Sequence, residues 1–284
     1  RDAQESRGLG DVYKRQVKKI ENAEFKVSDI KTSERFRKAP LPFTTSTLQQ
    51  EAAKALNFGT QKTMRIAQQL YEGVDIKGGG TVGVITYLRT DSTRISQEAD
   101  AECKEFIREN YGAENVMENA ARKKETKKIQ DAHEAIRPTD PARTPAAMKE
   151  SLTRDQFRLY QLIWKRFLAS RMKPARYETT SVKIAAGDYR FTVSASKVAF
   201  DGFRMIYTEA GEEKEESNVL AKSLDKDSVL QYESFDSKQH FTQPPAHYTE
   251  ASLVKTLEEL GIGRPSTYLS LIHISEPTRL LSIS

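Results

Sequence analysis

The amino-acid sequence predicts an α+β protein of several domains, in which a helical segment interrupts a mainly β segment. Two observations support this prediction. Apolar residues recur at helical spacing between residues 47 and 173, whereas apolar and polar residues alternate after residue 174. Helical spacing returns at Thr249, so the predicted order of segments is β, α, β, α. This order suggests a helical domain inserted into a β domain.

A strand and a helical pair are predicted in the first quarter of the chain. The strand lies in KKIENAEFKV, and a polar, basic connector broken by two prolines follows it. Ser46 or Thr47 is the predicted N-cap of the first helix. Thr60 begins the second helix and Gly73 ends it, so a helical pair is expected after a boundary near residue 45.

A strand and two longer helices are predicted next. The stretch TVGVITYL is rich in β-branched and aromatic residues, which favour a strand. The residues RTDS then turn the chain towards a helix that begins after Ser96 and ends at Gly112. Thr153 is the predicted cap of the strongest helix, DQFRLYQLIWKRFLASRM, whose aromatic residues are expected in the core.

The sequence after Pro174 predicts β structure and then helices. Apolar and polar residues alternate on both sides of Gly187-Asp188, which predicts a β-hairpin. Further strands are predicted at FRMIYTE and SVLQYESFD, on either side of the acidic loop GEEKEESN. Thr249 begins a helix that Gly261 ends, and Ser266 begins another.

Composition limits the class of protein without identifying it. Lys and Arg number 45 against 40 Asp and Glu, and the net charge of +5 suits a polyanionic partner such as nucleic acid. The single cysteine, Cys103, excludes an internal disulfide framework or a multi-cysteine zinc ribbon in this segment. No stretch has the roughly 20 apolar residues of a membrane helix, and the amino end lacks a signal-peptide core. A cytoplasmic protein with no membrane contact is therefore expected.

Three common catalytic motifs are absent from the sequence. No G-x-x-x-x-G-K-[ST] occurs, which excludes a P-loop ATPase in this segment. Gly261 and Gly263 follow a helix and lack a third glycine, which excludes a dinucleotide-binding fingerprint. His133-Glu134 is followed by Arg137 where H-E-x-x-H needs its second histidine, which excludes a zincin. No metal site is expected in this segment.

Tyr87 and Arg89, in ITYLRTDS, are the strongest candidates for chemistry. If the chain stays extended, both side chains project to the same face of a strand. A phenol with a pKa of about 10 needs help to attack phosphorus, and a guanidinium can hold phosphate oxygens as charge builds. A phosphotyrosine ester can be attacked again by the freed sugar hydroxyl, which suits reversible strand breakage. A buried tyrosine beside a solvated arginine is the alternative that this pair alone favours.

Three segments together resemble the signature sequences of type IA DNA topoisomerases. They are ITYLRTDSTRIS, QDAHEAIRPTD and EASLVKTLEELGIGRPSTY, and the similarity extends over most of residues 40–270. The resemblance implies that Tyr87 forms a 5′-phosphotyrosyl link and that Arg89 positions the phosphate and stabilises its charge. Asp91 and Ser92 are expected to order the turn beside the site.

Further residues are expected to line the site or to bind DNA. If HEAIR is helical, His133 and Arg137 share one face, where they reach DNA phosphate or the tyrosine pocket. A structural histidine is the alternative, and the resemblance favours the site-lining role. Arg264 offers a phosphate-binding fork, while Ser266 and Thr267 offer hydroxyls and helix amides, which are compatible with a helix cap. Contacts to the DNA backbone predict weak sequence preference and marked salt dependence.

The resemblance also implies parts that this segment lacks. Type IA enzymes carry an amino-terminal Toprim domain whose acidic cluster binds Mg²⁺, and nothing upstream of Val17 provides it. The parent protein is expected to be a monomeric, nucleoid-associated enzyme. It is expected to bind single-stranded DNA and to relax negatively supercoiled DNA with Mg²⁺ and without ATP. The fragment alone is expected to be inactive or severely impaired. A non-catalytic single-stranded DNA-binding module and a topoisomerase III-like decatenase are the alternatives.

The predicted boundaries follow the changes of pattern and the resemblance. Residues 1–16 and 271–284 resemble translated sequencing-adapter read-through. Residues 17–46 and 174–245 are expected to form a β arch, or gate, around a DNA-sized hole. Residues 47–173 are expected to form a helical, winged-helix-like domain with Tyr87, and residues 246–270 to begin a helical DNA-binding domain. The neighbourhoods of Pro40 and Pro174 are expected to act as hinges.

Overall fold

The computed structural model describes two compact units. It covers residues 17, 19–20, 23–118, 133–208, 224–231, 233–234, 241–264, 267–268 and 270. The β unit contains the described residues of Arg1–Arg37, Arg176–Phe200 and Glu213–Pro245. The helical unit contains the described residues of Lys38–Ala175, Asp201–Glu212 and Ala246–Ser284. The mixed α and β character agrees with the sequence prediction, whereas the insertion of one domain into another remains a prediction.

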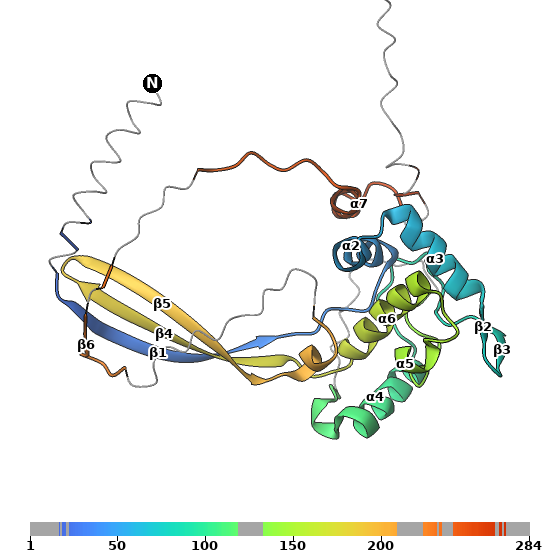
Figure 1. The fold of residues 1–284 in the computed structure, drawn as a ribbon, viewed down its shortest axis with the longest axis horizontal. Helices are drawn as coiled ribbons and strands as arrows, with labels where there is room; N and C mark the ends of the chain where they lie inside the picture. The colour runs from blue at the N-terminus through green and yellow to red at the C-terminus, as the bar shows by residue number, and fades with distance from the viewer. Residues whose placement is uncertain are drawn as a thin grey trace, which may run out of the picture. The chain divides into compact units, whose positions relative to one another are not determined.

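The β unit is built on a four-stranded sheet (Figure 1). Its strand order is β5-β4-β1-β6, with bounds β1 Phe25–Arg37, β4 Ala175–Ala186, β5 Tyr189–Phe200 and β6 Val229–Leu230. β4 and β5 form the predicted antiparallel hairpin, in which Val182 lies opposite Val193. Gly187 begins the turn at a φ of 60°, a left-handed conformation that costs glycine little. The buried Val27 and Tyr177 supply apolar surface to this sheet.

Some predicted strands are shifted or wrong. β1 begins only at Phe25 and runs through the polar connector to Arg37, because pairing with β4 and β6 supplies its backbone partners. FRMIYTE contains the 3₁₀-helix η2, Gly202–Met205, in place of a strand. Gly202 begins η2 at a φ of 51°, and a Cβ at this position would lie 2.4 Å from the Lys173 carbonyl oxygen, so glycine is required there.

The remaining predictions for this region are tested only in part. Within the described residues of SVLQYESFD, only Val229 and Leu230 form a strand, which pairs with the start of β1. The acidic loop GEEKEESN lies outside the described residues, and so do both predicted read-through ends, residues 1–16 and 271–284.

The helical unit is a set of short helices around α6. Their bounds are α2 Thr45–Leu56, α3 Thr60–Glu72, α4 Gln97–Tyr111, η1 Ala113–Asn115, α5 Pro145–Met148, α6 Arg154–Ala169 and α7 Glu250–Glu259. α6 supplies the core with buried side chains of Leu159, Tyr160, Ile163, Phe167 and Leu168. α2, α3 and α5 pack on α6, and α7 packs on α2 (Figure 1).

Local caps explain most helix boundaries. Ser96 and Thr153 cap α4 and α6 as predicted, and Thr249 caps α7 through a box with Ser252. The predicted cap of α2 is wrong. Thr44 caps this helix, because its hydroxyl accepts the Thr47 N–H while the Thr47 hydroxyl accepts the Thr44 N–H.

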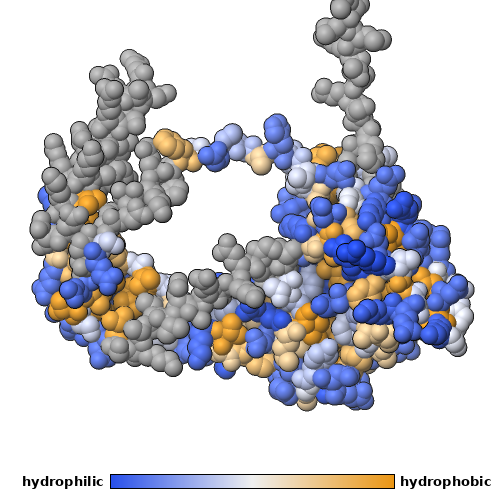
Figure 2. Space-filling model, in the orientation of Figure 1, coloured by the Kyte–Doolittle hydropathy of each residue, from blue (hydrophilic) through white to orange (hydrophobic). Residues whose placement is uncertain are grey.

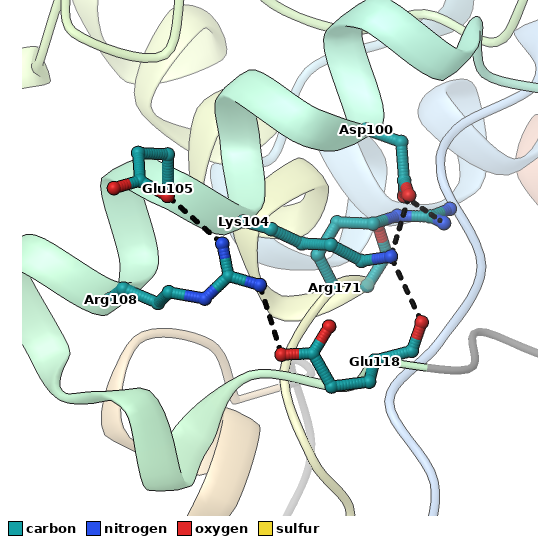
Figure 3. Close-up of polar contacts among 7 residues, drawn as sticks. Asp100, Lys104, Glu105, Arg108, Glu118 and Arg171 are labelled. Atoms are coloured by element: carbon teal, nitrogen blue, oxygen red, sulfur yellow. Dashed lines mark hydrogen bonds and ion pairs between the residues drawn. The ribbon is translucent and has the colours of Figure 1, made fainter.

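A network of charged side chains fastens α4 to neighbouring segments (Figure 3). Asp100 pairs with Lys104 at 2.7 Å and with Arg171, beyond the end of α6, at 3.0 Å. Arg108 pairs with Glu118 at 2.9 Å, which lowers the pKa of that carboxyl. The Asp100–Arg171 pair joins α4 to the segment after α6, and because its side chains are only 26% and 12% exposed, salt screens it less than a surface pair.

The surface of the helical unit carries both hydrophilic and hydrophobic residues. Figure 2 shows hydrophilic and hydrophobic side chains intermixed over this unit. Among the helices in the described ranges, none is both long enough and apolar enough to cross a membrane.

Candidate active site

Tyr87 lies in an irregular segment, so the predicted strand TVGVITYL is wrong over most of its length. Only Gly80–Val82 forms a strand, β3, which pairs with β2, Val74–Ile76. β2 begins directly after α3, so β3 has no partner residues left beyond Val82. The chain instead crosses the end of α3, where the Val84 N–H donates to the Leu70 carbonyl at 2.9 Å.

Gly83 permits this crossing. A Cβ at this position would lie 2.5 Å from the carbonyl oxygen of Tyr71, a distance that real Cβ atoms do not tolerate. Only glycine therefore lets the segment before Tyr87 lie directly against the end of α3. Tyr71, at this end of α3, becomes a neighbour of the candidate nucleophile.

Thr86 fixes the Tyr87 segment to the motif DAHEAIRPTD. Its N–H donates to the Arg137 carbonyl at 2.9 Å, and its hydroxyl donates to the Ala135 carbonyl at 2.7 Å. The Arg137 N–H donates back to the Thr86 hydroxyl at 3.0 Å. Isolated bridges from Ile136 to Phe43 and from Pro138 to Ile85 hold the described part of the motif, residues 133–140, in an extended conformation.

The HEAIR stretch is extended, so the helix that would have placed His133 and Arg137 on one face does not form. His133 and Arg137 therefore do not share a helical face, because pairing with two distant segments replaces the local bonds of a helix. The guanidinium of Arg137 pairs with Glu134 at 2.8 Å and donates to the Pro138 carbonyl at 3.0 Å. Its side chain is only 13% exposed.

Tyr87 is half-buried between two aromatic rings. The ring centroid of Tyr71 lies 5.5 Å away in an edge-on arrangement at 69°. The ring centroid of His133 lies 4.8 Å away at 37°. These contacts restrict the phenol ring while the partial exposure of Tyr87 leaves it accessible. The structure thus brings His133 to the tyrosine pocket, and it adds Tyr71, which sequence reasoning missed.

Arg89 and its neighbours form a turn beside Tyr87. The side chain of Arg89 is exposed, and it has no ion-pair partner among the residues that the structure describes. A bend at Leu88 and Arg89 replaces the predicted strand, so strand alternation does not place Arg89 beside Tyr87. Ser92 is buried, and its N–H donates to the Thr90 hydroxyl at 3.0 Å, which orders the turn.

The GIGRPST motif reaches this turn through one charged pair. Arg264, which follows α7, lies 3.8 Å from Asp91, and its side chain is 80% exposed. The Arg264 N–H donates to the Thr267 hydroxyl at 2.8 Å, so Thr267 has a capping contact. Ser266 lies outside the described residues. The predicted DNA-binding roles of these residues remain predictions.

The described residues do not fit a magnesium site. In this part of the chain, no three His, Cys, Asp or Glu side chains are grouped closely enough to hold a metal ion. The side chains that the structure places against the Tyr87 phenol are the Tyr71 ring and the His133 imidazole, and Arg89 follows two residues later in the chain.

Comparison with known proteins identifies the family. A family model described as DNA topoisomerase matches residues 6–276. The chain belongs to this family of bacterial type IA topoisomerases, as the three motifs predicted.

A solved structure of full-length topoisomerase I from Thermotoga maritima is similar to this chain. The two share 42% sequence identity and superpose with a TM-score of 0.76. The match covers 91% of this chain and 41% of the Thermotoga protein. This chain therefore spans less than half the length of that relative.

Proposed function

We propose that Tyr87 is the nucleophile of a type IA topoisomerase and that the whole protein relaxes negatively supercoiled DNA without ATP. The Tyr87 oxygen attacks a backbone phosphorus of single-stranded DNA and displaces the sugar 3′-oxygen. A 5′-phosphotyrosyl ester forms, and attack by the freed 3′-hydroxyl reverses the step. The observation that carries this proposal is the half-buried Tyr87, held between Tyr71 and His133 in a signature segment of the family.

Three further side chains support this reaction. The exposed guanidinium of Arg89 has no internal ion pair among the described residues, so it is available to a phosphate whose charge increases in the transition state. His133 lines the tyrosine pocket and can donate or accept a hydrogen bond there. Arg264 is largely exposed and is proposed to bind the DNA backbone.

Magnesium is proposed to be held outside the described residues. In the proposed whole enzyme, a Toprim domain binds Mg²⁺ and supplies acid and base groups to the reaction. This chain supplies the nucleophile and the side chains that hold the phosphate. We propose that the whole protein is monomeric and acts on DNA in the nucleoid, and that this chain alone is inactive or severely impaired.

A covalent protein–DNA adduct tests the proposal. The full-length protein that contains this chain is incubated with Mg²⁺ and single-stranded DNA labelled at its 3′ end, then denatured. The 3′ label is needed because a 5′-phosphotyrosyl link retains the downstream piece of the strand. Tyr87→Phe is expected to abolish the labelled adduct. Tyr71→Phe is the matched control, because Tyr71 contacts Tyr87 and is the neighbouring alternative phenol.

The possible outcomes separate the alternatives. An adduct that survives Tyr87→Phe would move the nucleophile to another residue. DNA binding without any adduct would favour a passive single-stranded DNA-binding module. Where the adduct depends on Tyr87, comparison of relaxation with decatenation distinguishes a topoisomerase I from a topoisomerase III-like enzyme.

A further inference from the structure

Thr45, the first residue of α2, holds both peptide groups that flank Arg89. Its hydroxyl donates to the Leu88 carbonyl at 2.7 Å and accepts the Thr90 N–H at 2.9 Å. Its own N–H donates to the Thr90 carbonyl at 2.9 Å. Thr45 is completely buried, so these bonds are shielded from water.

The Thr45 hydroxyl both donates a hydrogen bond and accepts one, which few kinds of side-chain atom can do. A threonine hydroxyl has one proton to donate and lone pairs that accept, so it can satisfy a carbonyl and an N–H together. The Leu88 carbonyl takes the proton, since it is closer than the Thr90 carbonyl at 3.1 Å. Without this hydroxyl, a buried carbonyl and a buried N–H would both lose a partner, which is costly.

The path of the chain at Arg89 depends on these bonds. The segment belongs to no strand, so no ladder of backbone bonds fixes it. The Arg89 side chain is exposed and has no ion-pair partner in the described ranges, so the bonds that hold this segment are those made to its backbone. Thr45 therefore fixes the backbone position from which the Arg89 side chain extends.

We infer that Thr45 is a positioning residue for strand cleavage and acts through the backbone of Arg89. This inference rests on the proposed function. Thr45 does not touch the substrate in this account; it holds Arg89 at the place where phosphate charge develops. Small displacements of a group that stabilises a transition state slow the chemical step strongly while substrate binding changes little.

Thr45→Val tests the inference in the full-length protein. The substitution removes the hydroxyl at nearly constant volume. The single-turnover rate of adduct formation is expected to fall about 10- to 100-fold, while the Kd for single-stranded DNA stays within about twofold. Thr45→Ser retains the hydroxyl and is expected to restore most of the rate. Thr45→Ala removes the hydroxyl without a new methyl group and replaces Thr45→Val if that variant does not fold.

Thr63→Val is the matched control. Thr63 is also completely buried, and its hydroxyl donates to the Gly59 carbonyl at the start of α3 at 3.0 Å. This variant loses a buried hydroxyl bond away from Arg89, so its cleavage rate is expected to stay near that of the unmodified protein.

A double-mutant cycle with Arg89→Ala tests whether the effect of Thr45 on cleavage depends on Arg89. If Thr45 acts through Arg89, Thr45→Val slows the Arg89→Ala protein by less than about twofold. An unchanged rate in Thr45→Val, or an equal loss with and without Arg89, overturns the inference. Failure of the unmodified protein to form an adduct overturns the proposed function itself, and the inference with it.

Discussion

Cys103 is the one cysteine of the chain, and its burial is expected to make the stability of the protein depend on pH. Removal from water raises the pKa of its thiol from 9.0 to about 12. The folded state therefore keeps the thiol proton at pH values where the unfolded state releases it. The contribution of the protonated thiol to stability is complete below pH 9.0 and is lost as the pH rises towards 12.

Cys103→Ala isolates this contribution. The difference in free energy of unfolding between the unmodified protein and this variant is expected to fall by up to about 1.4 kcal/mol per pH unit above the unfolded pKa. Urea unfolding on both sides of pH 9.0 measures it. A difference that stays constant across this range would mean that the thiol is accessible to water in the folded protein.

Among single residues, the sequence could identify those that lie in a linear motif. Tyr87, Arg89 and His133 lie in two of the signature segments. Tyr71 and Thr45 could not be found in this way, because they reach the site only through the packing of α3 and α2. Their residue types carry no signal, since tyrosines and threonines are common in helices and caps.

At the scale of elements, α7 supplies the side-chain cap that the N-terminus of α3 lacks. Gly59 provides no side-chain cap for α3, and the Glu250 carboxylate accepts bonds from the N–H and hydroxyl of Thr60 at 3.1 and 2.8 Å. A carboxylate also interacts favourably with the positive end of a helix dipole. On the same helix, Glu258 accepts a bond from the Ser46 hydroxyl of α2 at 2.6 Å. α7 is therefore held to both helices by its own acidic residues.

Glu250→Ala is expected to loosen α7. Loss of a cap costs about 0.5–2 kcal/mol, so amides of α7 and of the first turn of α3 should exchange with deuterium faster. Glu259→Ala is the matched control, because Glu259 is exposed and pairs only with Lys255 along α7 at 3.7 Å, among the contacts described. Equal exchange in the two variants would show that Glu250 does not hold the helix.

Helices and the long hairpin could be predicted because their signals are local. A cap such as Thr153 and an alternating pattern around Gly187 act within a few residues. The strand predicted at TVGVITYL and the helix considered for HEAIR do not form, because their signals are not local. Their conformations depend on hydrogen bonds to Phe43, to Leu70 and to each other, which no local pattern reveals.

For the molecule as a whole, the proposed DNA contacts predict salt-dependent binding. Each phosphate neutralised on single-stranded DNA contributes about 0.7 to the slope of log Kd against log salt concentration. Arg264→Ala is therefore expected to reduce this slope by about 0.7 in fluorescence anisotropy titrations of the full-length protein. Arg108→Ala is the control, since Glu105 and Glu118 already neutralise that guanidinium. An unchanged slope in Arg264→Ala would remove Arg264 from the DNA interface.

The connectivity of the two units predicts how the protein would behave after one proteolytic cut. The chain passes from the β unit to the helical unit after Arg37, returns at Arg176 and leaves again after Phe200. A protease that cuts between Arg37 and Lys38 would detach β1 from everything that follows it in sequence. Because β1 lies between β4 and β6 in the sheet and also makes side-chain contacts with β4, the severed strand would stay in place through non-covalent contacts. Such a nicked protein would elute as one particle in buffer and separate into two pieces only in denaturant.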